Sequence, residues 1–230
     1  MDAYTKPDYS SVALITIDTQ RDTLDGQPLE IPGTSAVLPN MTRLLEAFRA
    51  AGRPIIHIVR IYEPDGSNAD ICRKSAIEGG RAMLLVDSDG SQLASPLLPA
   101  GIRLDSRRLF SGDIQTITEH EVIIYKPRWG AFYGTALQTY LQTLKVSTLI
   151  FTGCNFPNCP RTSIYEASER DYRVVLITDA ISGLYERGVA ELQNIGVSLL
   201  TTEEVLGSMK RDEQTVNHTL HTNGFPRGSL

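Results

Sequence analysis

The chain has 230 residues, of which 41% are hydrophobic and 21% are charged, and its net charge at pH 7 is −5. This length and composition are typical of a single soluble α/β domain with a sizeable core. The acidic balance and the lack of a Lys/Arg run argue against nucleic acid or a membrane surface as a partner.

The N-terminal segment MDAYTKPDYSS has no apolar core of the kind found in signal peptides. No later stretch approaches the roughly 18 consecutive apolar residues that a membrane span needs. Three cysteines, an odd number, occur without an export signal, which favours a reducing compartment. We therefore expect a cytoplasmic protein.

Short apolar runs alternate with longer amphipathic stretches along the chain. The runs predict six β-strands, at residues 12–17, 54–60, 121–125, 148–151, 173–177 and, more weakly, 197–200. They are rich in β-branched residues and nearly continuous, which is typical of parallel strands covered on both faces. The stretches between most of them predict helices at 35–51, 135–144, 160–171 and 186–195. This alternation favours a three-layer, doubly wound α/β fold with a mainly parallel six-stranded sheet.

Two regions depart from this alternation. Residues 63–119 are rich in Gly, Pro, Ser and Asp and have little periodicity, which predicts a long insertion between the second and third strands. Long loops in compact domains are often functional. From residue 208 the chain is polar, which predicts a C-terminal arm that is either disordered or packed on a neighbouring subunit. We expect one domain over residues 1–207 and an arm over 208–230.

Chemically active side chains follow three of the predicted strands. Asp18 follows the first strand, Lys126 the third, and Cys154 and Cys159 the fourth. Because ligands bind beyond the carboxyl ends of parallel strands, an acid, an ammonium and a thiol should meet there. Pro160 favours a helix start, which would place the Cys159 sulfur at a helix N-terminus that stabilises a thiolate. A nearby Lys126 would lower the pKa of the thiol further.

These groups are the components of a cysteine hydrolase that acts on an amide-like carbonyl. Asp18 would be the general base, and backbone N–H groups of the 153–159 loop would form an oxyanion hole. Each group also has a structural interpretation: the aspartate as a cap or turn residue, the lysine as a solvated cation, and the cysteine as a small buried hydrophobe. Spacing alone leaves both interpretations open.

Three segments resemble the isochorismatase-like cysteine hydrolase family. ALITIDTQ at 13–20 is similar to the family's strand ending in D-x-Q. KPRWGAFYGTAL at 126–137 is similar to its K followed by A-F-x-G-T-x-L. TGCNFPNCPRTS at 152–163 resembles T-G-x-x-x-N-x-C-V-x-x-T, and DYRV at 171–174 and TDA at 178–180 continue the match. The resemblance spans roughly residues 11–206.

The resemblance implies roles for individual residues. It implies a triad of Asp18, Lys126 and Cys159, an oxyanion hole formed by the backbone N–H groups of Asn155 and Cys159, and a non-proline cis peptide bond just before Asn155. Cys159 would then be the nucleophile and Cys154 a packing residue. The leading hypothesis is a cysteine amidohydrolase that cleaves an amide or carbamoyl C–N bond of a small molecule through a thioester, and the four histidines add the expectation that it is metal-independent. A homodimer or homotetramer is the implied assembly.

The nucleophile loop departs from the family pattern. Pro157 occupies the place of the family's asparagine, Phe156 is bulkier than the usual Thr or Ser, and Pro160-Arg161 replaces a small apolar and polar pair. These changes leave the substrate and the shape of the oxyanion hole open. Two alternatives also stay open: isochorismatase-type hydrolysis of a vinyl ether, with Asp18 as the proton donor, and a non-catalytic family member that acts as a binding protein.

Candidates for substrate contact come from loops near the triad, although core packing or surface ion pairs explain each of them equally well. They are Gln20, Arg60, Trp129, Phe132, Tyr133, Phe156 and Arg161. The four histidines show no convincing ligand spacing, so we expect no metal site. Neither G-x-G-x-x-G nor a P-loop occurs, so we expect no nucleotide cofactor.

Overall fold

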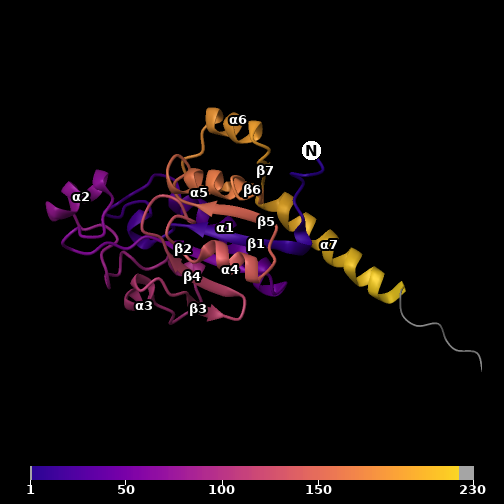
Figure 1. Cartoon of the computed structure of the whole chain (residues 1–230), viewed down its shortest axis with the longest axis horizontal. Helices are drawn as coiled ribbons and strands as arrows, with labels where there is room; N and C mark the ends of the chain where they lie inside the picture. The colour runs from indigo at the N-terminus through magenta and orange to yellow at the C-terminus, as the bar shows by residue number, and fades with distance from the viewer. Residues whose placement is uncertain (1, 223–230) are drawn as a thin grey trace, which may run out of the picture.

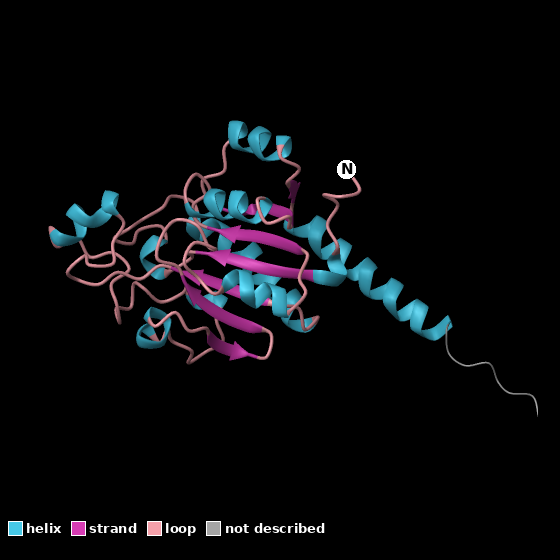
Figure 2. Cartoon of the chain, in the orientation of Figure 1, coloured by secondary structure: helices cyan, strands magenta, loops and turns pink. Residues whose placement is uncertain are grey.

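The computed structural model describes residues 2–222 of the chain. Its centre is a seven-stranded sheet with the order β3-β4-β2-β1-β5-β6-β7, drawn in magenta in Figure 2. Neighbouring strands are parallel except for the antiparallel pair β3–β4. The strands are β1 (Val12–Ile17), β2 (Ile55–Val59), β3 (Gln115–Thr118), β4 (Glu121–Tyr125), β5 (Thr148–Gly153), β6 (Arg173–Ile181) and β7 (Ser198–Leu200).

Helices cover both faces of the sheet (Figure 1). One face packs on α1 (Thr34–Ala50) and the start of α7 (Thr202–Thr222). The other packs on α4 (Leu137–Thr143), α5 (Cys159–Ser168) and α6 (Glu186–Asn194). The insertion after β2 holds α2 (Ile71–Glu78) and α3 (Ser106–Phe110), and short 3-10 turns are η1 (Tyr9–Ser11), η2 (Arg21–Thr23) and η3 (Ser95–Leu97).

Strand β1 shows why the sequence forms a covered parallel sheet. All six of its residues are buried. Val12 and Leu14 belong to the core under α1, whereas Ala13, Ile15 and Ile17 belong to the core under α4 and α5. The side chains therefore alternate between two apolar layers, as the period of two along a strand requires.

The three-layer α/β fold and all six predicted strands are confirmed, but the sheet has one strand more than predicted. The added strand, β3, has the polar sequence QTIT and lies at the edge of the sheet, where every second residue is exposed. No apolar run marks it, because an antiparallel edge strand needs only one buried face. It lies in the predicted insertion, together with α2 and α3.

The C-terminal region differs from its prediction. Instead of an arm that begins at residue 208, helix α7 runs continuously from Thr202 to Thr222 and extends away from the body of the molecule (Figure 1, yellow). Val205 and Met209 bury its first turns against α1 and β6. Residues 223–230 of the predicted arm lie outside the described residues. Within the described part of the chain, no helix is both long and apolar enough to cross a membrane.

The sheet has a topological switch point beside β1. From β1 the chain moves to β2 and β4 on one side, and it later returns to place β5 on the other side. Crevices at such points are the usual ligand sites of open α/β sheets. Gly153 at the end of β5 keeps the two strands close: its φ is +117°, and a Cβ there would lie 2.2 Å from the carbonyl oxygen of Ile17. Only glycine fits this position.

Candidate active site

The three predicted catalytic residues meet at the switch point. Asp18 follows β1, Lys126 follows β4, and Cys159 is the first residue of α5, after the loop that leaves β5. Asp18 has a φ of 47°, an uncommon backbone conformation for a residue other than glycine, and its N–H donates to the Ile58 carbonyl. The end of β2 thus fixes where the Asp18 carboxylate lies.

Lys126 joins the other two side chains. Its Nζ lies 2.9 Å from Asp18 Oδ2 and 3.2 Å from Cys159 Sγ, and it also donates to the Arg128 carbonyl at 3.2 Å. An ammonium has three donors, so these contacts use all of them. The lysine is fully buried, and the aspartate is nearly so. The other carboxylate oxygen, Asp18 Oδ1, is buried and accepts no hydrogen bond within the described residues.

The protonation state of Cys159 differs from the prediction. Burial and the Asp18 carboxylate raise the pKa of the Cys159 thiol to about 12, although Lys126 acts in the opposite direction. The prediction of a lowered pKa was therefore wrong, because it counted the cation and the helix N-terminus but not desolvation or the aspartate. Lys126 itself has a raised pKa: burial lowers it, but Asp18 and Cys159 more than offset that effect. The two raised pKa values favour a neutral Cys159 thiol beside a charged Lys126 ammonium at neutral pH.

The second cysteine has a different setting. Cys154 is buried, and its Sγ donates to the backbone carbonyl of Asp18 at 3.3 Å. Burial is the main cause that raises the pKa of Cys154 to about 12. This environment supports the packing role expected for it. The third cysteine, Cys72, is exposed on α2.

The loop before Cys159 presents two unused N–H groups. The peptide bond between Cys154 and Asn155 is cis, as the family resemblance implied. Phe156 N–H donates to the Ser182 carbonyl at 2.8 Å, and Asn158 N–H donates to the Asn155 carbonyl at 3.1 Å. Among the described residues, the N–H groups of Asn155 and Cys159 have no hydrogen-bond acceptor. These are the two groups that the sequence prediction assigned to an oxyanion hole.

A cavity of about 170 Å³ opens beside these groups. Asp18, Cys154, Asn155, Asn158 and Cys159 form its floor. Its remaining wall comes from the end of η2, from the loop that follows it and from the insertion, through Thr23, Leu29, Glu30, Ile31, Arg73 and Leu84. The sequence prediction named none of these wall residues. Their only sequence signal was the long aperiodic insertion, which contains Arg73 and Leu84 but marks no individual position.

The structure does not bring two of the expected polar contacts to this cavity. Gln20 is fully buried, and its amide bridges the backbone of Arg60 and Ser91. Arg60 is also buried: it donates to the Lys126 carbonyl at 2.8 Å and pairs with Asp70 at 2.9 Å. The polar groups of both side chains are thus already engaged by the protein. Arg60 lines only a narrow crevice beside Lys126 and Cys159.

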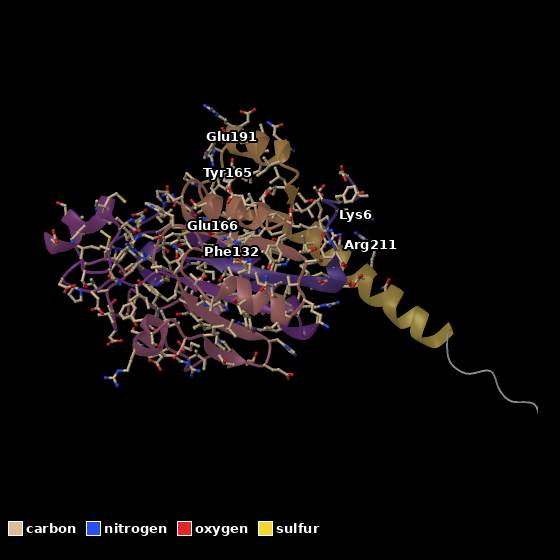
Figure 3. The ribbon with its side chains drawn as sticks, viewed as in Figure 1. Lys6, Phe132, Tyr165, Glu166, Glu191 and Arg211 are labelled. Carbon is tan, nitrogen blue, oxygen red and sulfur yellow. The ribbon has the colours of Figure 1, made fainter. Side chains whose placement is uncertain are left out.

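The expected aromatic contacts also lie elsewhere. Phe132 is in the core beside α5, where its N–H donates to Glu166, and Figure 3 marks the two residues close together. Phe156 is fully buried and packs edge-on against Tyr185. Tyr133 is largely exposed. Trp129 does lie at the site: its ring contacts the Arg73 guanidinium, and it lines a narrow crevice with Arg73 and Cys159.

Arg161 points away from the triad. It pairs with Glu191 on α6, donates to the Tyr185 hydroxyl and lies over the Tyr165 ring; Figure 3 labels Tyr165 and Glu191 on the α5–α6 side of the molecule. The departure from the family pattern at this position therefore serves the packing of α5 against α6. Within the described residues, no group of three or more His, Cys, Asp or Glu side chains is placed to hold a metal ion.

Comparisons with known proteins agree with this geometry. A model of the isochorismatase domain matches residues 12–204. The chain is 27% identical to the probable inactive nicotinamidase of Arabidopsis thaliana, over 85% of this chain and 95% of that protein. It is 29% identical to N-carbamoylsarcosine amidase of an Arthrobacter species, over 90% of this chain and 76% of that protein.

Solved structures give the same result. A crystal structure of an isochorismatase family protein from Desulfovibrio vulgaris superposes with a TM-score of 0.73 at 29% identity, covering 86% of this chain and 98% of that one. A cysteine hydrolase from Pseudomonas syringae superposes with a TM-score of 0.70 at 22% identity, covering 89% and 95%. The domain match spans most of the chain and the fold agrees: this protein belongs to the isochorismatase family of hydrolases, whose relatives include amidohydrolases.

Proposed function

We propose that the chain is a metal-independent cysteine amidohydrolase that cleaves an amide or carbamoyl C–N bond of a small molecule through a thioester. The observation that carries this proposal is the position of Lys126 Nζ within 3.2 Å of both the Asp18 carboxylate and the Cys159 thiol, two side chains that line the cavity. A buried ion pair that also contacts a thiol supplies a base, a nucleophile and a fixed positive charge in one place.

In the first half-reaction, Cys159 Sγ attacks the carbonyl carbon while Asp18 takes the thiol proton. Because the pKa of the thiol is raised, we place this proton transfer in the same step as the attack. The N–H groups of Asn155 and Cys159 donate to the resulting oxyanion. Asp18 then gives the proton to the leaving nitrogen, the C–N bond breaks, and an amine or ammonia departs.

In the second half-reaction, water attacks the thioester carbon. Asp18 accepts a proton from this water, and the same N–H groups hold the second oxyanion. When the C–S bond breaks, the sulfur recovers a proton from Asp18 and the acid product leaves. Lys126 keeps the carboxylate oriented throughout, and its charge offsets the negative charge that moves between oxygen and sulfur.

The names of relatives support a carbonyl–nitrogen bond as the target. Besides N-carbamoylsarcosine amidase, they include ureidoacrylate amidohydrolase of Methylobacterium radiotolerans, 26% identical, and maleamate amidohydrolase of Pseudomonas putida, 25% identical. Each of these names describes hydrolysis of an amide or carbamoyl group. We extend that bond type, and not any one of these substrates, to this chain.

Ammonia release from a panel of amides, ureas and N-carbamoyl compounds tests the proposal. Wild type and Cys159→Ala are compared with and without a chelator. We expect release by wild type in both conditions and at least about a thousandfold less by the variant, as for loss of a covalent nucleophile. Turnover that survives in Cys159→Ala would favour chemistry by Asp18 alone, as in vinyl-ether hydrolysis. Turnover lost to the chelator would contradict metal independence.

A non-catalytic role is the second candidate, and the relative described as a probable inactive nicotinamidase favours it. An idle site predicts no turnover of any compound in the panel and no covalent adduct on Cys159. The intact contacts of Lys126 and the two free loop N–H groups support catalysis instead. Binding without turnover across the whole panel would decide for the second candidate.

A further inference from the structure

Arg73 is a cation in the cavity wall that the proposed chemistry does not use. It lies in α2, which Figure 1 shows beyond the carboxyl ends of the central strands. The same cavity is lined by Asp18 and Cys159. A side chain from the insertion therefore faces the reacting groups across a space of about 170 Å³.

The protein holds this guanidinium in a fixed orientation. Its centre lies 4.8 Å from the centroid of the Trp129 ring, a cation–π contact, and Nη1 donates to the Tyr62 hydroxyl at 3.0 Å. Tyr62 in turn donates to Asp70 at 2.9 Å. These contacts use the face of the guanidinium and one donor. Its Nε and Nη2 groups donate to no residue in the described part of the chain.

The charges around Arg73 are otherwise balanced. Lys126 pairs with Asp18 at 2.9 Å, and Arg60 pairs with Asp70 at 2.9 Å. No described carboxylate lies within 4.0 Å of the Arg73 guanidinium, although Glu30 also lines the cavity from its exposed rim. The inner part of the site thus has one cation more than it has anions. A partly buried cation is stabilised when an anion with hydrogen-bond acceptors joins it.

We propose that Arg73 binds a carboxylate of the substrate, so that the preferred substrates are small carboxylic acids carrying an amide or N-carbamoyl group. The identity of the cleaved bond rests on the proposed function, whereas the binding of a carboxylate by Arg73 is independent of it. A guanidinium presents two parallel donors that match a carboxylate, and preorganisation by Trp129 and Tyr62 lowers the cost of holding them. The cavity volume of about 170 Å³ suits a small molecule that reaches both Arg73 and Cys159.

Binding to Cys159→Ala protein tests the proposal without requiring turnover. The ligands form matched pairs in which a carboxamide replaces the carboxylate: succinamate with succinamide, and N-carbamoylglycine with its amide. Calorimetry gives the dissociation constants. We expect the acid of at least one pair to bind about 10- to 100-fold more tightly than its neutral partner, which is the effect of one charge-assisted contact.

Two further variants distinguish binding of the carboxylate by Arg73 from a nonspecific effect of positive charge on helix α2. In Cys159→Ala/Arg73→Gln the preference should disappear while binding of the neutral ligand stays the same, which also shows that the cavity is intact. In Cys159→Ala/Lys74→Gln it should persist, because Lys74 is exposed on the same helix and pairs with Glu78 outside the cavity. Equal binding of acid and amide, no binding of any pair, or a preference that survives Arg73→Gln would overturn the proposal.

Turnover by the otherwise wild-type protein then separates this proposal from the proposed function. If both hold, Arg73→Gln raises KM for the acid about 10- to 100-fold and lowers the kcat/KM ratio of acid to neutral amide by the same factor, whereas Lys74→Gln leaves the kinetic constants for both substrates at their wild-type values. If acids bind in a way that depends on Arg73 but no compound is hydrolysed, the proposed amidohydrolase activity is rejected and the anion site is supported. If acid and amide are hydrolysed with equal kcat/KM and Arg73→Gln changes neither value, the amidohydrolase stands and the anion site at Arg73 is rejected.

Discussion

The Cys159 thiol carries its proton at neutral pH because burial and the Asp18 carboxylate raise its pKa to about 12. Asp18→Asn removes that carboxylate, so the pKa of the thiol should fall. We expect faster alkylation of Cys159 by iodoacetamide at pH 8, while hydrolysis is lost with the base. The rates are measured by peptide mass spectrometry in a Cys72→Ser background, since Cys72 is exposed. Unchanged or slower alkylation of Asp18→Asn would contradict this account of the thiol.

Lys126 is the residue on which the buried charges depend. Lys126→Met leaves the Asp18 carboxylate buried without a counter-ion, which should lower the free energy of unfolding by about 3–5 kcal/mol. The double variant Asp18→Asn/Lys126→Met removes both charges and should recover part of that loss. Urea unfolding of the two proteins measures the difference. A double variant less stable than Lys126→Met would show that the ion pair is not the cause.

At this scale the sequence predicted the reacting groups but not their surroundings. Asp18, Lys126 and Cys159 follow directly from strand ends and from a family pattern, so their meeting point could be inferred. The cavity wall depends on the path of the aperiodic insertion, and nothing in the sequence near Arg73 distinguishes it from Arg60. Arg60 is instead neutralised by Asp70, a contact that only the folded chain reveals.

At the scale of elements, the approach of β1 to β5 positions the nucleophile loop. Gly153→Ala would place a methyl group 2.2 Å from the Ile17 carbonyl oxygen, at a φ of +117°. We expect the free energy of unfolding to fall by at least about 2 kcal/mol, together with most of the activity. Gly112→Ala is the matched control, because its φ is +87° but no atom lies within 4 Å of the added Cβ. Equal losses in the two variants would show that φ, and not strand contact, sets the cost.

The elements also show where sequence patterns fail. Buried parallel strands are apolar on both faces, so all six were predictable. Strand β3 is half exposed and polar, and α7 looked like an arm because most residues of its outer part are polar. Every second residue of β3 is only half-buried, and the contacts of α7 with the body come from its first turns, so neither element has the apolar pattern that separates a regular element from a loop.

At the scale of the whole molecule, stability should depend on pH through a buried cluster opposite the active site. Glu121 accepts from Arg49 at 2.6 Å and lies 2.9 Å from His57 Nε2. The pKa of Glu121 falls to about 2, since these two partners outweigh the opposing effect of burial. The pKa of His57 is lowered as well, chiefly by burial.

Both pKa shifts make the folded protein less stable as the pH falls. Each group binds a proton more readily in the unfolded chain, so the contribution of His57 is lost as pH falls below about 6.5 and that of Glu121 as pH falls from about 4.5 toward 2. Urea unfolding between pH 7 and pH 3 should show this decline, and Glu121→Gln should flatten its acidic part. A variant with the wild-type slope would exclude Glu121 as the source.

The central claim is that Cys159 forms a thioester during turnover, and rapid acid quench followed by mass spectrometry tests it directly. With a substrate found in the panel, the wild-type peptide that contains Cys159 should gain the mass of the acyl or carbamoyl group. This mass should appear before steady state and be absent from Cys159→Ala. Steady turnover with no adduct on that peptide, or an adduct that persists in Cys159→Ala, would contradict the account.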